Sequence, residues 1–551
     1  MKRLIPLLLL LALPLSAAPS KRYIVTRTHD SVSAASVNAL DAQFMAAHAG
    51  RELGIINAFA VTLTDDEVVA MQKQPGIDAV YPVVERHLLE IAPASLKPGP
   101  AVSPYTLKQT VTYGLDLVHA RDVWPYARGR NVNVAILDTG VTTNHPDLAA
   151  NVAGGYNAIT RGTNFLDDHG HGTHVAGTIA GVDNNVGVIG VAPEARVWAV
   201  KVLQADGNGT NEDVIVAADW VLAKKKEVGG NWIMSMSFGS GETSPPEEAA
   251  FRRLQDADIF PIAASGNSGF WSLEYPAAYA SVMSVGAVDS VKQSAWFSSG
   301  GGTLGVMAPG VDVLSTVRLG SNFTGEAERG VAHVFGMPLK QSARGNFTAQ
   351  VVLCGFGGVG ECDGDATGKI ALIARGNNLT FAEKVRNVMA QGAVAVIIYN
   401  FDDTALLQWS LVRYDCDGNN ICTDNKDDLA YPWPVALELK KSDAMKLQQS
   451  GGTITLGVWD DDYGYKSGTS MAAPHAAGVA ALLWSLAPNA HAIDLRRAME
   501  LTAEDLGPKG WDPTNGNGML NALAAAKALA PAAFGLPPNQ MPSPRRRSTN
   551  H

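Results

Sequence analysis

Gly468-Thr469-Ser470-Met471-Ala472-Ala473-Pro474-His475 places a serine between small residues and opens an apolar run, rich in alanine and glycine, that continues to residue 486. The run predicts a buried helix. A serine at the start of a helix lies among unpaired backbone N–H groups and at the positive end of the helix dipole, where a developing oxyanion is stabilised. A capping role for Thr469 or Ser470 is the alternative, since both residue types cap helices well. The remaining motifs of the chain distinguish these two interpretations.

Between residues 131 and 288 the sequence alternates apolar runs with helical runs of small residues. The apolar runs predict five buried strands, at residues 132–137, 197–203, 232–237, 259–264 and 282–288. Helical patterns at residues 211–225 and 246–257 lie between them. This alternation predicts an α/β fold in which helices cover both faces of a mostly parallel sheet. Functional side chains of such sheets collect at the carboxyl ends of the strands.

Three polar motifs accompany these elements. Asp138-Thr139-Gly140 ends the first strand, Asp168-His169-Gly170-His171-Gly172-Thr173-His174 opens a helix, and Gly266-Asn267-Ser268 follows a later strand. Aspartic proteases need two carboxylates that share a proton, but the sequence has only one Asp-Thr-Gly and lacks their all-β pattern. Three close histidines could suggest a metal site, but no His-Glu-x-x-His arrangement is present.

The four motifs, in this order along the chain, resemble those of the subtilisin-like (subtilase) serine proteases, whose catalytic residues follow the order Asp, His, Ser. The resemblance covers residues 108–317 and 463–530 and implies a three-layer, subtilisin-like fold. It implies that Ser470 is the nucleophile, that His171 takes its proton, and that Asp138 orients His171. Asn267 and the backbone N–H of Ser470 would form the oxyanion hole. It gives the other histidines no catalytic role.

The resemblance also implies a cleft for an extended substrate. Ser237, Phe238 and Gly239 would pair with the substrate backbone, and Ala264 and Ser265 would form the opposite wall of the pocket. A peptide added as an extra strand binds through main-chain hydrogen bonds, so broad endopeptidase action is expected. Near the pocket base, where the family often has a small residue, this sequence has Glu274. A carboxylate there would favour basic or polar residues before the cleaved bond; a solvent-facing glutamate on a variable loop is the alternative.

A structural calcium site is implied by the same resemblance. Its ligands would be the side-chain oxygens of Gln109, Asp147 and Asn184 and the carbonyls of Val182, Val186 and Val188. These are hard oxygen ligands of the kind that Ca²⁺ prefers. If Gln109 lies near the mature N-terminus, cleavage should fall close before it, near Leu107. Residues 415–419 resemble a second calcium loop more faintly, without the glycine and the glutamate of an EF-hand.

Two segments precede the catalytic domain. Residues 1–18 combine a charged start, a short apolar run and a small-x-small ending, which predicts a signal peptide; the run is shorter than the ~20 residues of a membrane span. Residues 19–107 predict a small α+β domain and linker, with strands at 23–25, 58–63 and 77–85 and helices at 33–47 and 65–73. The closing Val80-Tyr81-Pro82-Val83-Val84-Glu85 resembles the inhibitory propeptide of subtilases. A permanent N-terminal domain is the alternative.

Residues 318–462 interrupt the subtilase pattern. A strand-like run at 368–376, a helix at 381–391 and a strand at 393–399 resemble the protease-associated (PA) domain inserted in some subtilases, which would shape access to the cleft or bind protein substrates. All four cysteines lie here. The pairs Cys354–Cys362 and Cys416–Cys422 are expected, although three pairings are possible, and the spacing disfavours a zinc site. Residues 531–551 are expected to form a flexible tail.

The composition sets the outer limits of function. A chain of 551 residues predicts two or three domains, and its net charge of −10 at pH 7 gives no reason to expect nucleic-acid binding. We therefore predict a secreted, monomeric serine endopeptidase without a membrane span. It would act on proteins or peptides through an acyl-enzyme, as a self-processing zymogen inhibited by its own propeptide. The alternatives are an inactive triad scaffold that binds partners through the PA domain, and another hydrolase such as an esterase.

Overall fold

The computed structural model describes residues 19–28, 44–91, 109–269, 272–330, 332–403, 409–416, 422–448 and 452–537. The chain divides into two compact units: Met1–Glu90 with Gln109–Thr316 and Gly468–His551, and Ile91–Lys108 with Val317–Ser467. The expected signal peptide, most of the helix expected at 33–47, the linker before Gln109 and the tail beyond residue 537 lie outside the described residues. Within those ranges, none of the helices combines the length and the apolar character that a bilayer crossing needs.

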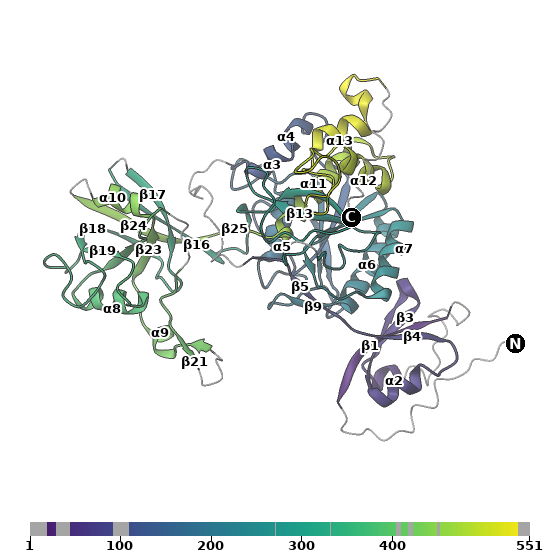
Figure 1. Ribbon diagram of the computed structural model, residues 1–551, viewed down its shortest axis with the longest axis horizontal. Helices are drawn as coiled ribbons and strands as arrows, with labels where there is room; N and C mark the ends of the chain where they lie inside the picture. The colour runs from purple at the N-terminus through teal and green to yellow at the C-terminus, as the bar shows by residue number, and fades with distance from the viewer. Residues whose placement is uncertain are drawn as a thin grey trace. The chain divides into compact units, whose positions relative to one another are not determined.

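The first unit is built on a seven-stranded parallel sheet of order β14-β13-β12-β10-β6-β8-β7 (Figure 1). Its strands are β6 (Val132–Asp138), β7 (Val152–Asn157), β8 (Arg196–Lys201), β10 (Asn231–Met236), β12 (Ile259–Ala264), β13 (Met283–Val288) and β14 (Leu304–Pro309). Five of them were predicted. The two edge strands, β7 and β14, were not, because β7 contains two glycines and neither has a long apolar run. The predicted α/β fold is confirmed.

Helices cover both faces of this sheet. α6 (Asn211–Val228) and α7 (Pro245–Asp256) contact each other on one face. α5 (His171–Ala180) and α11 (Thr469–Leu486) contact each other and strand β6 on the opposite face. Other helices of this unit are α3 (Tyr113–Leu117), α4 (Ala120–Val123), α12 (Ala492–Leu501) and α13 (Ala522–Leu529), and β15 (Val313–Thr316) is one of its short strands. α5 and α11 therefore begin close to the carboxyl end of β6, the edge where functional side chains collect.

The N-terminal residues form an antiparallel sheet of order β2-β3-β1-β4, and helix α2 contacts its strands β3 and β4. Its elements are β1 (Ser20–Arg27), β2 (Arg51–Leu53), β3 (Ala58–Thr64), α2 (Asp65–Met71) and β4 (Ile77–Pro82). The single strand predicted at 77–85 is wrong in its extent. It ends at Pro82, which has no N–H to continue a ladder, and a separate strand, β5 (Glu85–Leu88), pairs elsewhere.

This N-terminal sheet packs on α6 and α7. Ile24, Leu53 and Ala60 share one buried apolar cluster with Val214 of α6 and Phe251 of α7. Charged contacts surround that cluster: the Arg22 guanidinium donates to Glu212 (Nε to Oε2, 2.7 Å), and Arg51 contacts Asp213 (3.4 Å). The two carboxylates lie in the first turn of α6, where the helix dipole favours negative charge.

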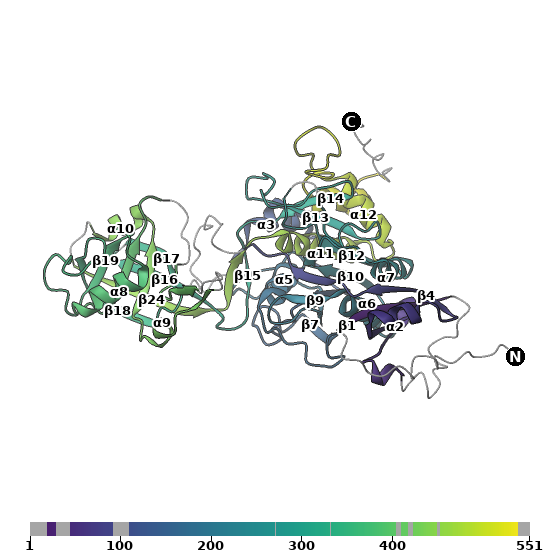
Figure 2. The same ribbon diagram turned by 60° about the horizontal axis from the view of Figure 1, so that its bottom comes forward.

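The second unit contains a closed barrel of order β16-β17-β23-β20-β19-β18-β24 (Figure 2). Its elements are β16 (Asn322–Arg329), β17 (Ala332–Pro338), β18 (Gly345–Leu353), β19 (Ile370–Ala374), α8 (Phe381–Ala390), β20 (Ala395–Tyr399), β21 (Tyr414–Cys416), β22 (Cys422–Asp424), α9 (Lys426–Ala430), β23 (Val435–Leu439), α10 (Lys441–Gln448), β24 (Thr453–Asp461) and β25 (Tyr463–Lys466). The predicted pair Cys354–Cys362 forms a disulfide. Cys416 and Cys422 lie opposite each other in the β21–β22 ladder, but their side chains are outside the description.

Candidate active site

Asp138 and His171 form a buried pair at the carboxyl end of β6. His171 Nδ1 lies 2.8 Å from Asp138 Oδ1 and 3.0 Å from Oδ2, and neither residue is exposed to solvent. The backbone N–H of Thr139 donates to Asp138 Oδ1 (2.7 Å), which fixes the carboxylate. An ionised carboxylate only accepts hydrogen bonds, so Nδ1 carries the proton and Nε2 is left as the basic nitrogen.

Ser470 occupies the first turn of α11 and is tied to the segment after β10. Its Oγ donates to the carbonyl of Ser237 (2.7 Å), and the Ser237 hydroxyl donates to the carbonyl of Ser470 (2.9 Å). Pro474 explains the second bond. In a regular helix the N–H of residue 474 would donate to the Ser470 carbonyl, but proline has no N–H. The Ser237 hydroxyl therefore replaces the missing helical hydrogen bond.

Asn267 presents a free amide donor beside this helix. Its Oδ1 accepts from the N–H and the hydroxyl of Thr469 (both 2.9 Å), which fixes the orientation of the amide. Its Nδ2 is buried and meets no acceptor among the described residues. A Cβ on Gly468 would lie 3.2 Å from Nδ2 and would collide with the carbonyl oxygen of Leu89. A glycine is thus required where a carbonyl approaches this donor.

β5 lies in the cleft as an extended strand between two others. The small sheet has the order β11-β5-β9, with β11 at Phe238–Gly239 and β9 at Asn208–Thr210. Phe238 is opposite Leu88 in antiparallel register. Beyond β5, the N–H of Leu89 donates to the Ser237 carbonyl (3.4 Å), the same oxygen that Ser470 Oγ contacts. The carbonyl of Leu89 therefore lies beside the nucleophile and the amide donor.

Comparisons with known proteins agree with this geometry. A sequence profile of the subtilase family matches residues 129–336 and 359–518, more than half of the chain. The chain belongs to the subtilase family. A thermostable alkaline protease of Halalkalibacterium halodurans is 35% identical over 316 residues, which are 56% of this chain and 78% of the relative. Subtilisin DY of Bacillus licheniformis is 42% identical over 213 residues, 38% of this chain and 75% of that protein.

A solved structure supports the same assignment. The psychrophilic subtilisin-like protease Apa1 of Pseudoalteromonas sp. AS-11 aligns with a TM-score of 0.55 at 30% identity, covering 77% of this chain and 99% of that chain. The fold is the subtilisin-like α/β fold, and the protein is a subtilisin-like serine protease, a hydrolase.

Replacing Asn267 by leucine in this subtilase should lower kcat by about 10²–10³-fold, a magnitude known from subtilisin's own oxyanion amide. Leucine keeps the size of the side chain but removes the amide donor that would face the developing oxyanion. KM for a short peptide should change little, since the donor acts mainly in the transition state. The matched control is Asn231→Leu, an amide whose Nδ2 donates to Pro488 at the surface. A rise in KM with an unchanged kcat would contradict the assignment of Asn267 to the oxyanion hole.

Asp167 was not identified from the sequence. Its carboxylate accepts five hydrogen bonds: from the N–H groups of His169 (3.0 Å), Gly170 (2.8 Å) and Thr173 (2.9 Å) and from the hydroxyls of Thr139 (2.8 Å) and Thr173 (2.5 Å). Burial alone would raise the pKa of this carboxyl, but the hydrogen bonds hold it below its ordinary value. Asp167 thereby fixes the start of α5, which carries His171. An acid just before a helix was the available signal.

The other histidines near the motifs have structural contacts. His174 Nε2 bonds to the carbonyl of Val313 (2.9 Å). His475 is fully buried in α11, with Nδ1 bonded to the carbonyl of Met471 (2.7 Å). Burial lowers the pKa of His475 to about 4, so this ring is neutral near pH 7. One ring nitrogen of His174 and one of His475 thus bond to backbone carbonyls.

Glu274 is buried, not solvent-facing. Its N–H donates to the Ser265 carbonyl (2.9 Å), and its Oε1 accepts from Ser268 Oγ (2.9 Å). A Cβ on Gly239 would lie 3.0 Å from Glu274 Oε2 and 3.2 Å from Leu89 Cδ1. Glu274 and the Leu89 side chain therefore flank the same glycine. Ser265 follows Ala264, the last residue of β12.

The predicted calcium ligands lie together. Gln109 Nε2 donates to the carbonyls of Val182 (2.5 Å) and Val188 (3.2 Å). Asp147 accepts from Asn184 Nδ2 at Oδ1 (2.9 Å) and from the N–H of Val188 at Oδ2 (2.8 Å). Several carbonyl and carboxylate oxygens thus converge on two amide groups.

These residues fit a calcium ion. The N–H of Val186 donates to Asn184 Oδ1 (3.0 Å), so the sixth predicted ligand residue belongs to the same loop. Amide nitrogen and oxygen are nearly identical in shape. Turning the amides over would direct the oxygen of Gln109 toward the Val182 and Val188 carbonyls and the oxygen of Asn184 toward the Asp147 carboxylate. An all-oxygen donor set of this kind suits Ca²⁺.

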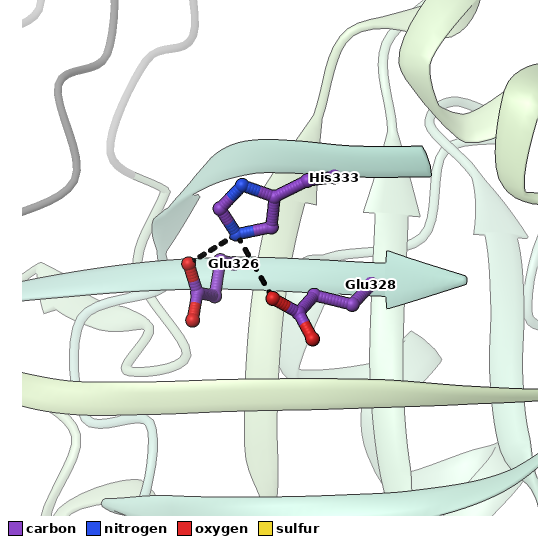
Figure 3. Close-up of side chains that lie close together, drawn as sticks. All are labelled: Glu326, Glu328 and His333. Atoms are coloured by element: carbon purple, nitrogen blue, oxygen red, sulfur yellow. Dashed lines mark hydrogen bonds and ion pairs between the residues drawn. The ribbon is translucent and has the colours of Figure 1, made fainter. Parts of the chain in front are cut away.

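A second group of metal-ligand side chains lies in the inserted segment. Figure 3 shows His333 of β17 beside Glu326 and Glu328 of β16, with Nε2 at 2.5 Å and 3.4 Å from their carboxylates. His333 and Glu328 are exposed. The two ion pairs account for this arrangement without an ion.

Proposed function

We propose that this subtilase is a secreted serine endopeptidase that cleaves peptide bonds in proteins through Asp138, His171 and Ser470, and that it is made as a self-inhibited precursor. The observation that carries the proposal is β5. Residues 85–89 run through the cleft as an antiparallel substrate strand, and the Leu89 carbonyl lies beside Ser470 and Asn267. This is the placement that a peptide about to be cleaved requires.

The proposed reaction uses Ser470, His171, Asp138 and Asn267 in turn. Ser470 Oγ attacks the substrate carbonyl while its proton passes to His171 Nε2, and Asp138 stabilises the imidazolium that forms. Asn267 Nδ2 and the N–H of Ser470 donate to the oxyanion. Collapse breaks the C–N bond, His171 returns the proton to the leaving amine, and an acyl-enzyme remains. Water then repeats the sequence, releasing the acid and restoring the serine hydroxyl.

We propose that the first bond cut is Leu89–Glu90 of the same chain. The N–H of Leu89 is held by the Ser237 carbonyl, and two residues further on the N–H of Ile91 donates to the Ser467 carbonyl (2.8 Å). After cleavage, residues 19–89 would stay bound as an inhibitor through β5, the apolar cluster and the arginines. The cut expected near Leu107 would then be a second trimming step that frees Gln109.

The preference at the residue before the cleaved bond is proposed to depend on Glu274. Leu89 already occupies that position, so an apolar side chain is accepted. The Glu274 carboxylate flanks the same glycine and would add an interaction with a basic or polar side chain. Equal cleavage after Phe and Arg in a peptide library would contradict this role.

Calcium binding is proposed to stabilise the catalytic domain, in the uncut precursor as well as in the processed enzyme. In a Ser470→Ala background, which prevents autolysis, removal of Ca²⁺ with EGTA should lower the melting temperature by roughly 5–10 °C, since ~100-fold saturation of one site contributes about 2.7 kcal/mol. Asp147→Asn should abolish this difference. Asp183→Asn is the control, because Asp183 lies in the same loop but forms an exposed ion pair with Arg128. An EGTA effect that persists in Asp147→Asn would place the ion elsewhere.

The proposed role of residues 318–462 is that of a PA domain which governs access of protein substrates. A deletion variant that loses casein digestion but still cleaves a short peptide would support it. Equal loss of both activities would contradict it.

Two assays of the secreted protein test the proposed function. A fluorophosphonate should label Ser470, and casein should be digested faster than simple esters; absence of an adduct at Ser470 would favour the inactive scaffold. N-terminal sequencing should find Glu90 or a residue shortly before Gln109. A secreted protein that begins at residue 19 and digests casein would make the N-terminal segment a permanent domain.

A further inference from the structure

Arg86 has a buried, charged side chain that lies against Glu247 and Ser240. It lies on β5, three residues before Leu89, and its side chain is not exposed at all. Its Nε and Nη2 donate to Glu247 Oε1 (3.2 Å) and Oε2 (2.6 Å), and its Nη1 donates to Ser240 Oγ (2.6 Å). All three guanidinium nitrogens therefore have acceptors, two of them on one carboxylate.

The acceptors belong to the catalytic fold and not to the N-terminal sheet. Glu247 lies in the first turn of α7 and is itself fully buried. Tyr279 donates to Glu247 Oε2 (3.0 Å), and it also bonds to the backbone of Ser244, the residue that caps α7. Burial and the nearby carboxylate raise the pKa of Tyr279, so it stays a neutral donor. The carboxylate is thus held in place by residues that remain when β5 leaves.

We propose that Glu247, Ser240 and Tyr279 form an acidic pocket that binds a basic side chain at the fourth residue before the cleaved bond, so that this subtilase selects substrates with arginine there. The proposal rests on the proposed function, in which Leu89–Glu90 is cleaved. The acidic pocket adds a substrate class to that function: peptides with the pattern Arg-x-x-Leu immediately before the cleaved bond. The acidic pocket is distinct from the wall at Glu274, which faces the residue next to the bond.

The chemistry of the acidic pocket favours arginine over other occupants. Burial alone would lower the pKa of Arg86, but the attraction of Glu247 raises it, so the guanidinium stays charged. A planar guanidinium matches the carboxylate with two parallel bonds, whereas lysine offers a single point charge. A leucine at that place would bury the Glu247 carboxylate without a cationic partner, which costs more than the pair itself gains. A glutamate would add repulsion.

The alternative is that the Arg86–Glu247 pair serves only to dock the N-terminal segment during folding. That role predicts no preference in the mature enzyme, because any peptide could bind through its backbone alone. The processed protein distinguishes the two roles. It lacks residues 19–89, so only added substrates can bind in the acidic pocket.

The test uses processed wild-type enzyme and four quenched fluorescent hexapeptides. They copy residues 86–91, Arg-His-Leu-Leu-Glu-Ile, with Arg, Lys, Leu or Glu as the first residue. We expect kcat/KM to fall in the order Arg, Lys, Leu, Glu, with Arg at least about 30-fold above Leu. In Glu247→Gln the ratio of Arg to Leu should drop to within about threefold. Glu248→Gln changes the neighbouring half-buried carboxylate, which pairs with Arg252, and should keep the wild-type ratio.

Each outcome has one meaning. Cleavage of all four peptides within threefold of one another would overturn the acidic pocket and leave the endopeptidase intact. No cleavage of any peptide, together with no fluorophosphonate adduct at Ser470, would overturn the proposed function and the acidic pocket with it. Because the wild-type panel decides the question alone, a poorly folded Glu247→Gln does not block the test.

Discussion

Replacing Ser470 by alanine is expected to lower kcat on peptides by about 10⁶-fold, a magnitude taken from the same substitution in subtilisin. The hydroxyl is the proposed attacking atom, and its Oγ shares the Ser237 carbonyl with the N–H of Leu89. The same variant should accumulate as the uncut precursor, because Leu89–Glu90 is the bond proposed to be cut first. Mass spectrometry of the purified protein and steady-state kinetics measure the two effects.

Two controls accompany this variant. Ser281→Ala removes another buried hydroxyl, one without a hydrogen-bond partner among the described residues, and should process and cleave normally. Active enzyme added in trans should cut the Ser470→Ala precursor if the bond is accessible. A Ser470→Ala precursor that still processes itself in a host without other proteases would exclude Ser470 as the processing nucleophile.

Replacing Asp138 by asparagine is expected to lower kcat by about 10⁴-fold, the scale of loss known for the corresponding substitution in a trypsin-like triad. The two contacts of 2.8 and 3.0 Å hold a proton on His171 Nδ1. An asparagine amide can instead donate to Nδ1, which stabilises the tautomer whose Nε2 carries the proton and cannot act as a base. The rate of fluorophosphonate labelling should fall together with kcat.

The size of this loss separates chemistry from folding. Asp116→Asn, a change at an exposed carboxylate, is the matched control and should be neutral. The melting temperature of Asp138→Asn should stay within a few degrees of wild type, since the amide is isosteric. A variant that keeps most of its activity would show that His171 is oriented by another group.

The sequence predicted the fold and the site where their signals are local. Five of the seven sheet strands are continuous apolar runs, and Asp138, His171 and Ser470 each lie in a short motif with a fixed place at a strand end or helix start. Glu247 and Arg86 had no such signal, because they are 161 positions apart and meet only when β5 enters the cleft. For the same reason, the end of β4 and the start of β5 looked like one strand. Asp167 was overlooked beside the more conspicuous histidines.

The paired hydrogen bonds between Ser237 and Ser470 have a mechanical consequence. The segment that would pair with a substrate backbone and the proposed nucleophile are joined by two hydrogen bonds, hydroxyl to carbonyl in each direction. If the bound peptide slid by one residue along Phe238–Gly239, a different peptide carbonyl would face the nucleophile. The nucleophile would not come to face the space between two carbonyls. The pairing of the peptide with Phe238–Gly239 therefore fixes which peptide carbonyl faces Ser470. In every pairing register that this segment permits, a carbonyl faces Ser470 and its peptide bond can be cut.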